Sequence, residues 1–117
     1  MIHDHLTIAE ICKIAITNQL FVSGWCMRGE MKAPSFIRKA ALFFVEEKPV
    51  GVAIVTEYYD VQIFVRKAYR RQGIGRTLIK HLRKKMGRNA SKLDAGKGNQ
   101  ASVHFWEALK MKRWDLE

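Results

Sequence analysis

Residues 65–76 of the chain read VRKAYRRQGIGR and join two segments of different hydrophobic periodicity. Before them, Val61, Ile63 and Val65 alternate with other residues, a spacing typical of a β-strand. After them, apolar residues recur at helical spacing, and lysines and arginines occupy the opposite face. The apolar residues of this segment are Ile74, Leu78, Ile79, Leu82 and Met86. The stretch therefore predicts a strand, a glycine-containing loop and an amphipathic helix.

This loop has the features of an anion-binding site. Gly73 and Gly75 carry no Cβ, so the backbone can approach a ligand closely. The helix that follows presents unpaired N–H groups and partial positive charge at its first turn. Arg70, Arg71 and Arg76 add full charges around it, which suits a pyrophosphate. The same pattern also fits a glycine-rich turn before a basic surface helix, and it completes neither a GxxxxGK[ST] nor a GxGxxG motif.

The remaining sequence predicts one mixed α/β domain over residues 1–117. Thr7 and Glu10 have capping-box spacing at the start of a helical pattern. Gly51 lies inside a predicted strand, which indicates a bulge or a close approach of another element. Residues 21–38 leave open a short helical turn on either side of the break at 33–35. The expected elements are a helix at 8–20, strands at 40–46, 50–58 and 61–65, the helix from Ile74, a short strand at 91–95, a helix around 103–109 and a strand at 111–116.

Charge is distributed unevenly along the chain. The net charge is +10, yet residues 1–65 hold six basic and seven acidic side chains, whereas residues 66–117 hold fifteen basic and four acidic ones. A nucleic acid, a membrane surface or a phosphorylated cofactor could each match this basic half. No apolar run reaches the ~20 residues of a membrane span. The two cysteines, Cys12 and Cys26, are too few for a disulfide framework, so we expect both to be core thiols. A reducing environment, and hence a cytoplasmic location, is the corresponding expectation.

Three segments together resemble the GNAT superfamily of N-acetyltransferases. The first is the loop, where Arg70, Gly73 and Gly75 match the family's acyl-CoA signature of Arg or Gln, two variable residues and Gly-x-Gly. The second is the predicted hairpin around residues 48–51, and the third is the NQASVHFWEAL segment at 99–109. The resemblance covers about residues 39–113 in the family's order. It implies a truncated GNAT-like α/β fold, with a mostly antiparallel mixed sheet splayed between its fourth and fifth strands and flanked by helices.

The resemblance also implies acetyl-CoA as cosubstrate and no metal. Backbone groups of Ile63, Phe64 and Val65 pair with the pantetheine arm in such a fold, and Asn99 lies beside it. Ser102 belongs to the same matched segment and is a further cofactor-binding candidate. The residues expected around the pyrophosphate are Arg70, Arg71, Gln72, Gly73, Ile74, Gly75 and Arg76.

The catalytic residues follow the family pattern only in part. Trp106 stands where the family often has a Tyr that protonates the leaving thiolate. The indole N–H of Trp106 can donate a hydrogen bond, but it is not an acid of useful pKa. Some members have a Glu near the start of the fourth strand that acts as the general base, and the matching position in this sequence is Tyr59. Glu57, two residues earlier, would share a face with Tyr59 on an extended strand, whereas Asp60 would point the other way. We therefore expect Glu57 to act as general base through water, with Tyr59 and Trp106 as the other catalytic candidates.

The acceptor of the acetyl group is left open by the sequence. A protein lysine, a protein N-terminus and a small amine all fit direct attack of a primary amine through a tetrahedral intermediate. Little before Thr7 predicts a first strand, so we expect an exposed sheet edge that a homodimer could cover. The alternatives are a protein that binds CoA without turnover, and a protein associated with nucleic acid through Lys80, Arg83, Lys84, Lys85 and Arg88.

Overall fold

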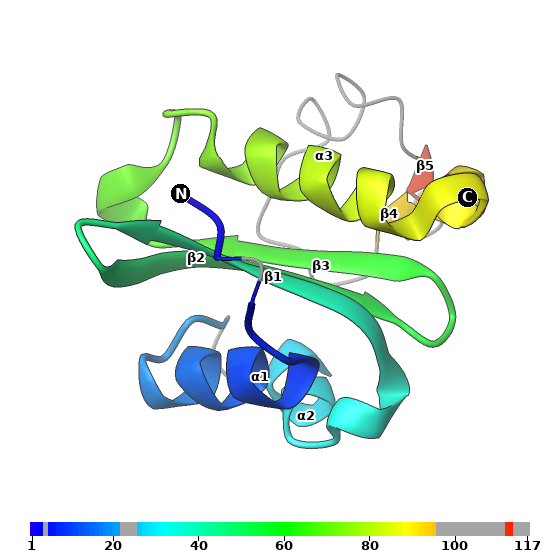
Figure 1. The fold of residues 1–117 in the computed structure, drawn as a ribbon, viewed down its shortest axis with the longest axis horizontal. Coiled ribbons are helices and arrows are strands. Elements are labelled where there is room, and N and C mark those ends of the chain that lie inside the picture. Colours follow the sequence, from blue (N-terminus) through cyan, green and yellow to red (C-terminus); the bar gives the residue numbers. More distant parts are fainter. Residues whose placement is uncertain (4, 22–25, 96–111, 114–117) are drawn as a thin grey trace.

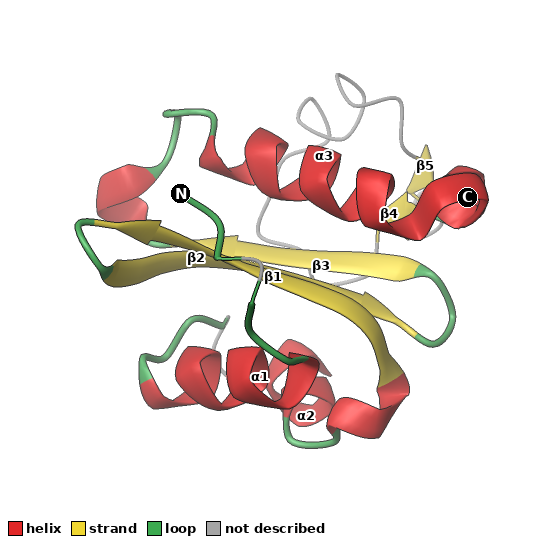
Figure 2. Cartoon of the chain, in the orientation of Figure 1, coloured by secondary structure: helices red, strands yellow, loops and turns green. Residues whose placement is uncertain are grey.

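A computed structural model describes residues 1–3, 5–21, 26–95 and 112–113. Its sheet has five strands in the order β1-β2-β3-β4-β5, and helices cover both faces (Figures 1 and 2). The strands β1 (Ile37–Val45), β2 (Lys48–Thr56) and β3 (Asp60–Val65) are antiparallel neighbours. The two-residue strands β4 (Asp94–Ala95) and β5 (Lys112–Arg113) continue the sheet in parallel. This is the mixed, mostly antiparallel α/β sheet that the sequence predicted.

The helix α1 (Ile8–Thr17) begins as its capping box predicts. The Thr7 hydroxyl accepts the Glu10 amide at 3.1 Å, and the Glu10 carboxylate accepts the Thr7 amide at 2.9 Å. The helix ends before the predicted residue 20 because the Asn18 side chain donates to the Ile14 carbonyl oxygen and Gln19 has a φ of 56°. Both short turns that the next segment left open are present, as α2 (Cys26–Met31) and the 3₁₀ turn η1 (Pro34–Phe36).

The hairpin of β1 and β2 turns one residue earlier than predicted. Glu46 and Glu47 both have positive φ, at 49° and 66°, so they form the two-residue turn and β2 begins at Lys48. The register shifts after Phe43, which pairs with Gly51. A Cβ at Gly51 would lie 3.2 Å from Cγ2 of Ile74, so the predicted bulge and the predicted close approach are both confirmed.

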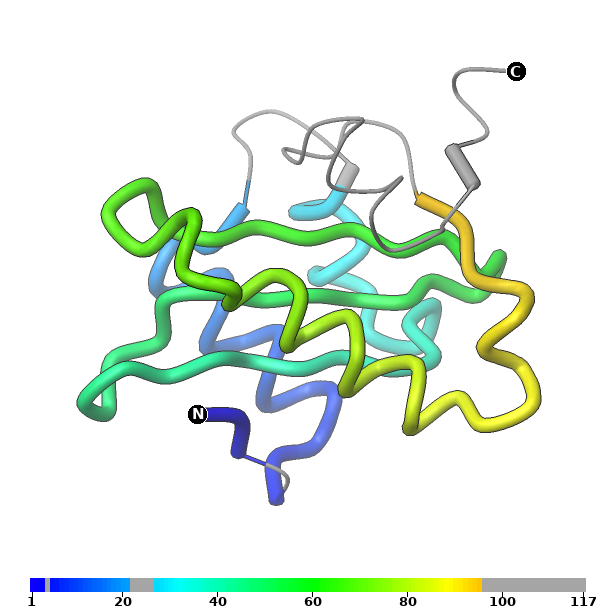
Figure 3. The backbone as a smooth tube through the Cα atoms, turned by 90° about the horizontal axis from the view of Figure 1, so that it is seen from above, coloured from blue at the N-terminus to red at the C-terminus, as the bar shows by residue number. Residues whose placement is uncertain are grey.

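Two apolar layers fix α1, α2 and α3 (Ile74–Met86) on the sheet. On one face, all five apolar positions predicted for α3 are buried among strand residues such as Ala53 and Val61. On the other face, Ile11, Cys12 and Ala15 of α1 pack with Val52 and Ile54 of β2. Figure 3 shows α3 lying obliquely across the three long strands. Side chains of β2 are consequently buried on both faces.

Other expected boundaries change for local reasons. β2 ends at Thr56, not at residue 58, because Glu57 and Tyr58 form a turn and Tyr59 has a φ of 68°. A 3₁₀ turn, η3 (Gly87–Lys92), occupies the start of the strand expected at 91–95. Ile2 forms a bridge with Phe43, so the residues before Thr7 do add a short pairing to β1. The helix expected around 103–109 lies outside the described residues.

The strand β3 connects the two regions that matter for function. Its first residues, Asp60 and Val61, pair with Asp94 and Ala95 of β4. Its last residue, Val65, leads through the 3₁₀ turn η2 (Lys67–Tyr69) to the start of α3. The loop at 70–73 and the turn at 57–59 therefore lie at opposite ends of this strand (Figure 1). By strand geometry the two ends are about 17 Å apart.

Candidate functional site

The loop between η2 and α3 is an open cradle of backbone amides. Arg71 and Gly73 have φ values of 65° and 79°, and Gly73 is the N-cap of α3. A Cβ built on Gly73 meets no protein atom within 4 Å. The amide of Thr77 is bonded to the Gly73 carbonyl oxygen, but no backbone acceptor is recorded among the described residues for the three preceding amides of the helix. Those amides and the helix dipole give this position the chemistry of an anion site.

The arginines of the loop divide into two groups. Arg71 and Arg76 are exposed at the start of α3. Arg70 turns back along the strand, where its Nε donates to the Val65 carbonyl oxygen at 2.9 Å and its guanidinium lies over the Phe64 ring. Arg70 therefore ties the loop to the end of β3, whereas the other two provide exposed positive charge beside the amides. Gln72 is also exposed.

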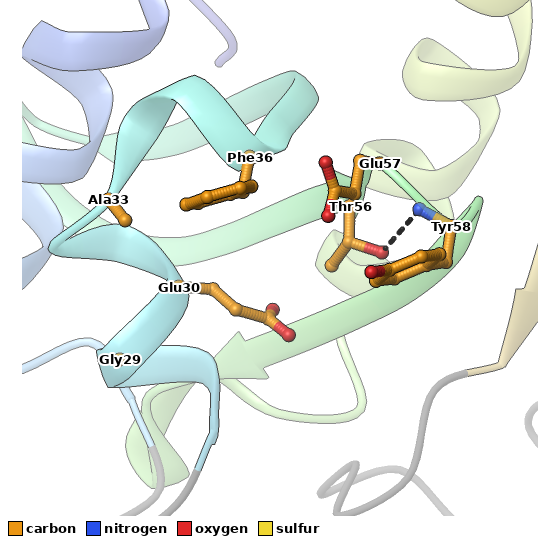
Figure 4. Close-up of a pocket in the computed structure, with 7 residues that line it drawn as sticks. All are labelled: Gly29, Glu30, Ala33, Phe36, Thr56, Glu57 and Tyr58. Carbon is orange, nitrogen blue, oxygen red and sulfur yellow. Dashed lines mark hydrogen bonds between the residues drawn. The ribbon is translucent and has the colours of Figure 1, made fainter.

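A second concave region lies at the opposite end of β3. It is a pocket of about 310 Å³ lined by α2, η1 and the turn after β2 (Figure 4). Its lining residues are Gly29, Glu30, Ala33, Phe36, Thr56, Glu57 and Tyr58. Phe36 and Tyr58 are 51% and 80% exposed, so two aromatic rings stand in solvent beside a polar floor.

Glu30 is the unusual group of this pocket. Its Oε2 is inaccessible to solvent and has no hydrogen-bond partner in the described part of the chain. Burial, followed by the nearby Asp60 carboxylate, raises the pKa of Glu30 to about 7, and a hydrogen bond from Gln62 opposes the rise. The carboxyl group is therefore poised to exchange a proton near neutral pH, which is the property of a general base or of a cation ligand.

Polar side chains of the sheet hold the neighbouring carboxylate. The Thr56 hydroxyl and the Gln62 amide both donate to Asp60. Thr56 and Gln62 are buried, at 2% and 4% exposure, and they are the two buried polar residues of the described core. Glu30 and Asp60 consequently face each other from α2 and β3 within one hydrogen-bonded group.

The predicted catalytic residues separate in space. Glu57 lines the pocket, its amide donates to the Phe36 carbonyl oxygen, and its carboxylate raises the pKa of Tyr58 through a hydrogen bond. Tyr59 packs against the apolar layer under α3, and its ring lies 4.2 Å from the guanidinium carbon of Arg38 and 5.1 Å from Nζ of Lys92. The two residues therefore do not share a face, because they belong to a turn rather than to an extended strand.

Other expected site residues have different outcomes. Ile63 and Val65 point into the layer under α3, whereas Phe64 packs on the α1 side, as strand alternation requires. Asn99, Ser102 and Trp106 lie outside the described residues. Cys12 is buried in the core, where burial raises its pKa to about 11, so its thiol stays protonated as a core thiol should.

Glu30 was missed by sequence reasoning because its segment had no clear periodicity. One signal was available, since Gln62 and Thr56 occupy positions of β3 and β2 that face the core. Buried polar side chains need partners, and they therefore point to a polar group on the element packed against them.

Comparison with known proteins places the chain in a family. The family model of the acetyltransferase (GNAT) family matches residues 10–111. The chain belongs to this family and is an acyltransferase of the N-acetyltransferase class. A comparison with curated proteins found no match.

Solved structures share the fold at low sequence identity. A GNAT-family acetyltransferase from Streptococcus pneumoniae is 17% identical, with a TM-score of 0.59, 96% of this chain covered and 85% of that one. The ribosomal-protein-S18-alanine N-acetyltransferase from Escherichia coli is 20% identical, with a TM-score of 0.57 and coverages of 93% and 75%. AAC(6')-Iy, solved with a bisubstrate analogue of CoA and acetylneamine, is 15% identical, with a TM-score of 0.57 and coverages of 87% and 83%.

Two further features are absent from the described residues. No group of three or more His, Cys, Asp or Glu side chains is arranged there to hold a metal ion. Within the same residues, no helix combines the length and the apolarity that a membrane crossing requires.

Proposed function

We propose that the protein transfers an acetyl group from acetyl-CoA to a primary amine. The observation that carries this proposal is the arrangement along β3, which has an anion cradle after its last residue and a carboxylate-containing pocket beside its first. A donor with a pyrophosphate at one end and a thioester at the other needs two such places joined by an extended path.

The cradle supplies the donor site of this proposal. The backbone amides from Arg71 to Arg76 wrap the pyrophosphate, and the exposed side chains of these two residues add charge. Open space at the Gly73 Cβ position supports this assignment, since a ligand oxygen can approach the backbone there. The pantetheine arm follows residues 63–65, and Asn99 and Ser102 are proposed to contact it from the segment beyond the described residues.

The reaction requires a neutral amine. A free alkyl ammonium has a pKa of about 10.4, so it must lose a proton before its nitrogen can attack the thioester carbonyl carbon. Glu57 lines the pocket and is proposed to receive this proton through water. A backbone N–H near Phe64 or Val65 polarises the carbonyl oxygen. The thiolate leaves readily without a strong acid because a thiol has a pKa of about 8.5, which leaves Trp106 a packing role.

Tyr59 is proposed as a positioning residue. Its carbonyl oxygen accepts the Asp94 amide at 3.1 Å, which fixes the start of β4 against β3. The cations of Arg38 and Lys92 both lie near its ring. Tyr59 therefore sets the point from which the two parallel strands diverge, and it does so without touching the reacting atoms.

Steady-state thiol release tests the proposal. Acetyl-CoA is mixed with the purified full chain and with each of a set of primary amines, and free CoA is measured. We expect release that depends on both substrates and saturates in each. Binding of acetyl-CoA with no release above hydrolysis for any amine would instead support a CoA-binding protein without turnover.

A further inference from the structure

The pocket at the start of β3 carries negative charge that no described cation neutralises. Glu30 and Glu57 line it, and the Asp60 carboxylate lies near Glu30. Arg38 of β1 directs its Nε to the Glu57 carbonyl oxygen and its guanidinium to the Tyr59 ring. No ion pair involving these three carboxylates is recorded among the residues that the structure describes. Such a site lowers its electrostatic energy when it binds a cation.

The chemistry of the pocket indicates an organic cation. The described residues offer no cluster with metal-ligand geometry. The rings of Phe36 and Tyr58 are largely exposed beside the opening, where they can cover a methylene stem or contact an ammonium group through their faces. The volume of about 310 Å³ suits a slim molecule or a single side chain.

We propose that this pocket binds the acceptor as an unbranched aliphatic primary ammonium, with the charged nitrogen at the Glu30 carboxylate and the methylene stem between Phe36 and Tyr58. This inference rests on the proposed acetyltransferase function and names its substrate class. Glu30 is the group that selects the substrate, and Asp60 supports it from β3. Glu57 stands at the rim, one step further from the amine.

The Glu30 carboxylate gives the ammonium its place. Glu30 extends from α2 and lines the pocket (Figure 4). Its Oε2 is shielded from solvent and has no hydrogen-bond partner among the described residues. Gln62 and Thr56 donate to Asp60, and Gln62 also hydrogen-bonds the Glu30 carboxyl group. A bound ammonium carries three N–H donors, which the Glu30 carboxylate can accept from the pocket side.

Proton transfer then follows from the pKa of Glu30, which burial and Asp60 raise to about 7. One ammonium proton passes to the Glu30 carboxylate, and the neutral nitrogen forms a C–N bond to the acetyl carbonyl carbon. The C–S bond breaks, and the second nitrogen proton goes to the departing thiolate, which leaves as CoA thiol. The proton on Glu30 passes through water and Glu57 to the solvent. The products are the acetamide, CoA thiol and one released proton.

The alignment of the pocket with β3 connects it to the donor site. Asp60, Gln62 and Phe64 alternate along one face of β3, and Phe64 packs there with residues of α1. Because Asp60 lies near Glu30, an amine held at Glu30 is close to the start of the strand that leads to the cradle at residues 70–73. A donor whose pyrophosphate occupies the cradle can extend its thioester along this strand towards the amine.

The experiment compares Glu30→Gln with the wild-type protein, using cadaverine, Nα-acetyl-lysine amide, an alanyl peptide and aniline as acceptors. Thiol release gives kcat/KM for each acceptor, and calorimetry gives the Kd of acetyl-CoA. Glu47→Gln is the matched control, because it removes an exposed carboxylate from the hairpin turn remote from the pocket. We expect Glu30→Gln to lower kcat/KM for cadaverine and the lysine amide by about tenfold or more while the Kd of acetyl-CoA is unchanged.

The pH profile of the wild-type protein adds a readout that does not depend on a variant. The titratable or charged groups around Glu30 are Asp60 on β3, Glu57 and Tyr58 in the turn, and Arg38 on β1. We expect kcat/KM for cadaverine to rise with pH through a group near 7, and this step to disappear in Glu30→Gln.

The outcomes separate the inference from the function it rests on. Loss restricted to the two aliphatic ammonium acceptors supports the pocket assignment, and the better of these two shows whether a small amine or a lysine side chain is the source. Preference of the wild type for the alanyl peptide, or an equal loss of kcat/KM for all four acceptors in Glu30→Gln, overturns it while the acetyltransferase function stands. Absence of acetyl-CoA binding and of thiol release in the wild type overturns both.

Discussion

Replacement of Gly73 by alanine tests the cradle. Gly73 has a φ of 79° and a ψ of 7° at the N-cap of α3, and an added Cβ meets no protein atom within 4 Å. The substitution therefore costs only the strain of a left-handed alanine, about 1 kcal/mol, which lowers Tm by about 4 °C. The new methyl group stands where the proposed phosphate approaches the backbone. We expect acetyl-CoA affinity to fall at least about tenfold, equivalent to about 1.4 kcal/mol.

Gly87→Ala is the matched control for this substitution. Gly87 is the C-cap of the same helix, has a φ of 57°, and likewise has no atom within 4 Å of an added Cβ. It lies at the other end of α3, so its replacement should lower Tm at least as much and leave the Kd of acetyl-CoA unchanged. Calorimetric titration and thermal melting give the two quantities for each variant. Wild-type affinity in Gly73→Ala, or equal losses in both variants, would refute the placement of the pyrophosphate at this loop.

Three further perturbations have expected outcomes. Gly51→Ala places a Cβ 3.2 Å from Ile74 at the first turn of α3. We therefore expect a loss of about 1–2 kcal/mol in stability by denaturant titration, together with weaker acetyl-CoA binding. Unchanged binding would show that this contact does not position the cradle. Thr7→Ala removes the N-cap of α1 and should cost about 1 kcal/mol in the same titration without changing that binding, and a lowered affinity would contradict the separation of α1 from the donor site. The pKa of Glu30 is raised from 4.5 to about 7 in the folded state, so its protonation stabilises the fold below pH 4.5 and this contribution is lost as the pH rises through 7. Glu30→Gln should therefore be more stable than wild type at pH 8, by about 1 kcal/mol after allowance for the partial exposure of Glu30. A variant less stable than wild type at pH 8 would contradict the sign of this effect.

Short-range patterns predicted features of α3, α1 and β2. The apolar stripe of α3, the capping box of α1 and the close approach at Gly51 each depend on neighbours within one element or one hairpin, and the structure confirms all three. Boundaries failed where residues other than glycine take positive φ. Glu46 and Glu47 do so in the hairpin turn, and Tyr59 does so after β2.

The acceptor pocket could not be read from the sequence in the same way. Its lining includes Glu30 of α2, and tertiary packing brings the Asp60 carboxylate of β3 near this residue. The strand alternation that favoured Glu57 over Asp60 assumed an extended chain through residue 59, whereas the chain turns at 57–59. Glu57 consequently lines the pocket from a turn, whereas Asp60 lies on β3 near Glu30 and outside the pocket lining.

The basic residues that give the net charge of +10 have different surroundings in the structure. Arg71 and Arg76 stand beside the open amides, and Arg70 is bonded to the end of β3. Arg66 has a structural role, because its guanidinium donates to the carbonyl oxygens of Asn18 and Pro49. Lys84 and Lys85 are exposed in the last turn of α3, where they complement the helix dipole.

The most direct test is to identify the product of the reaction by mass spectrometry. The protein is incubated with acetyl-CoA and cadaverine at neutral pH, and both the amine and the CoA thiol are quantified over time. We expect monoacetylated cadaverine to form in a one-to-one ratio with CoA thiol, at a rate proportional to the protein and greatly reduced in Glu30→Gln. Formation of CoA thiol without any acetylated amine, or no reaction under conditions where acetyl-CoA binds, would contradict the claim that β3 joins a donor cradle to an amine pocket.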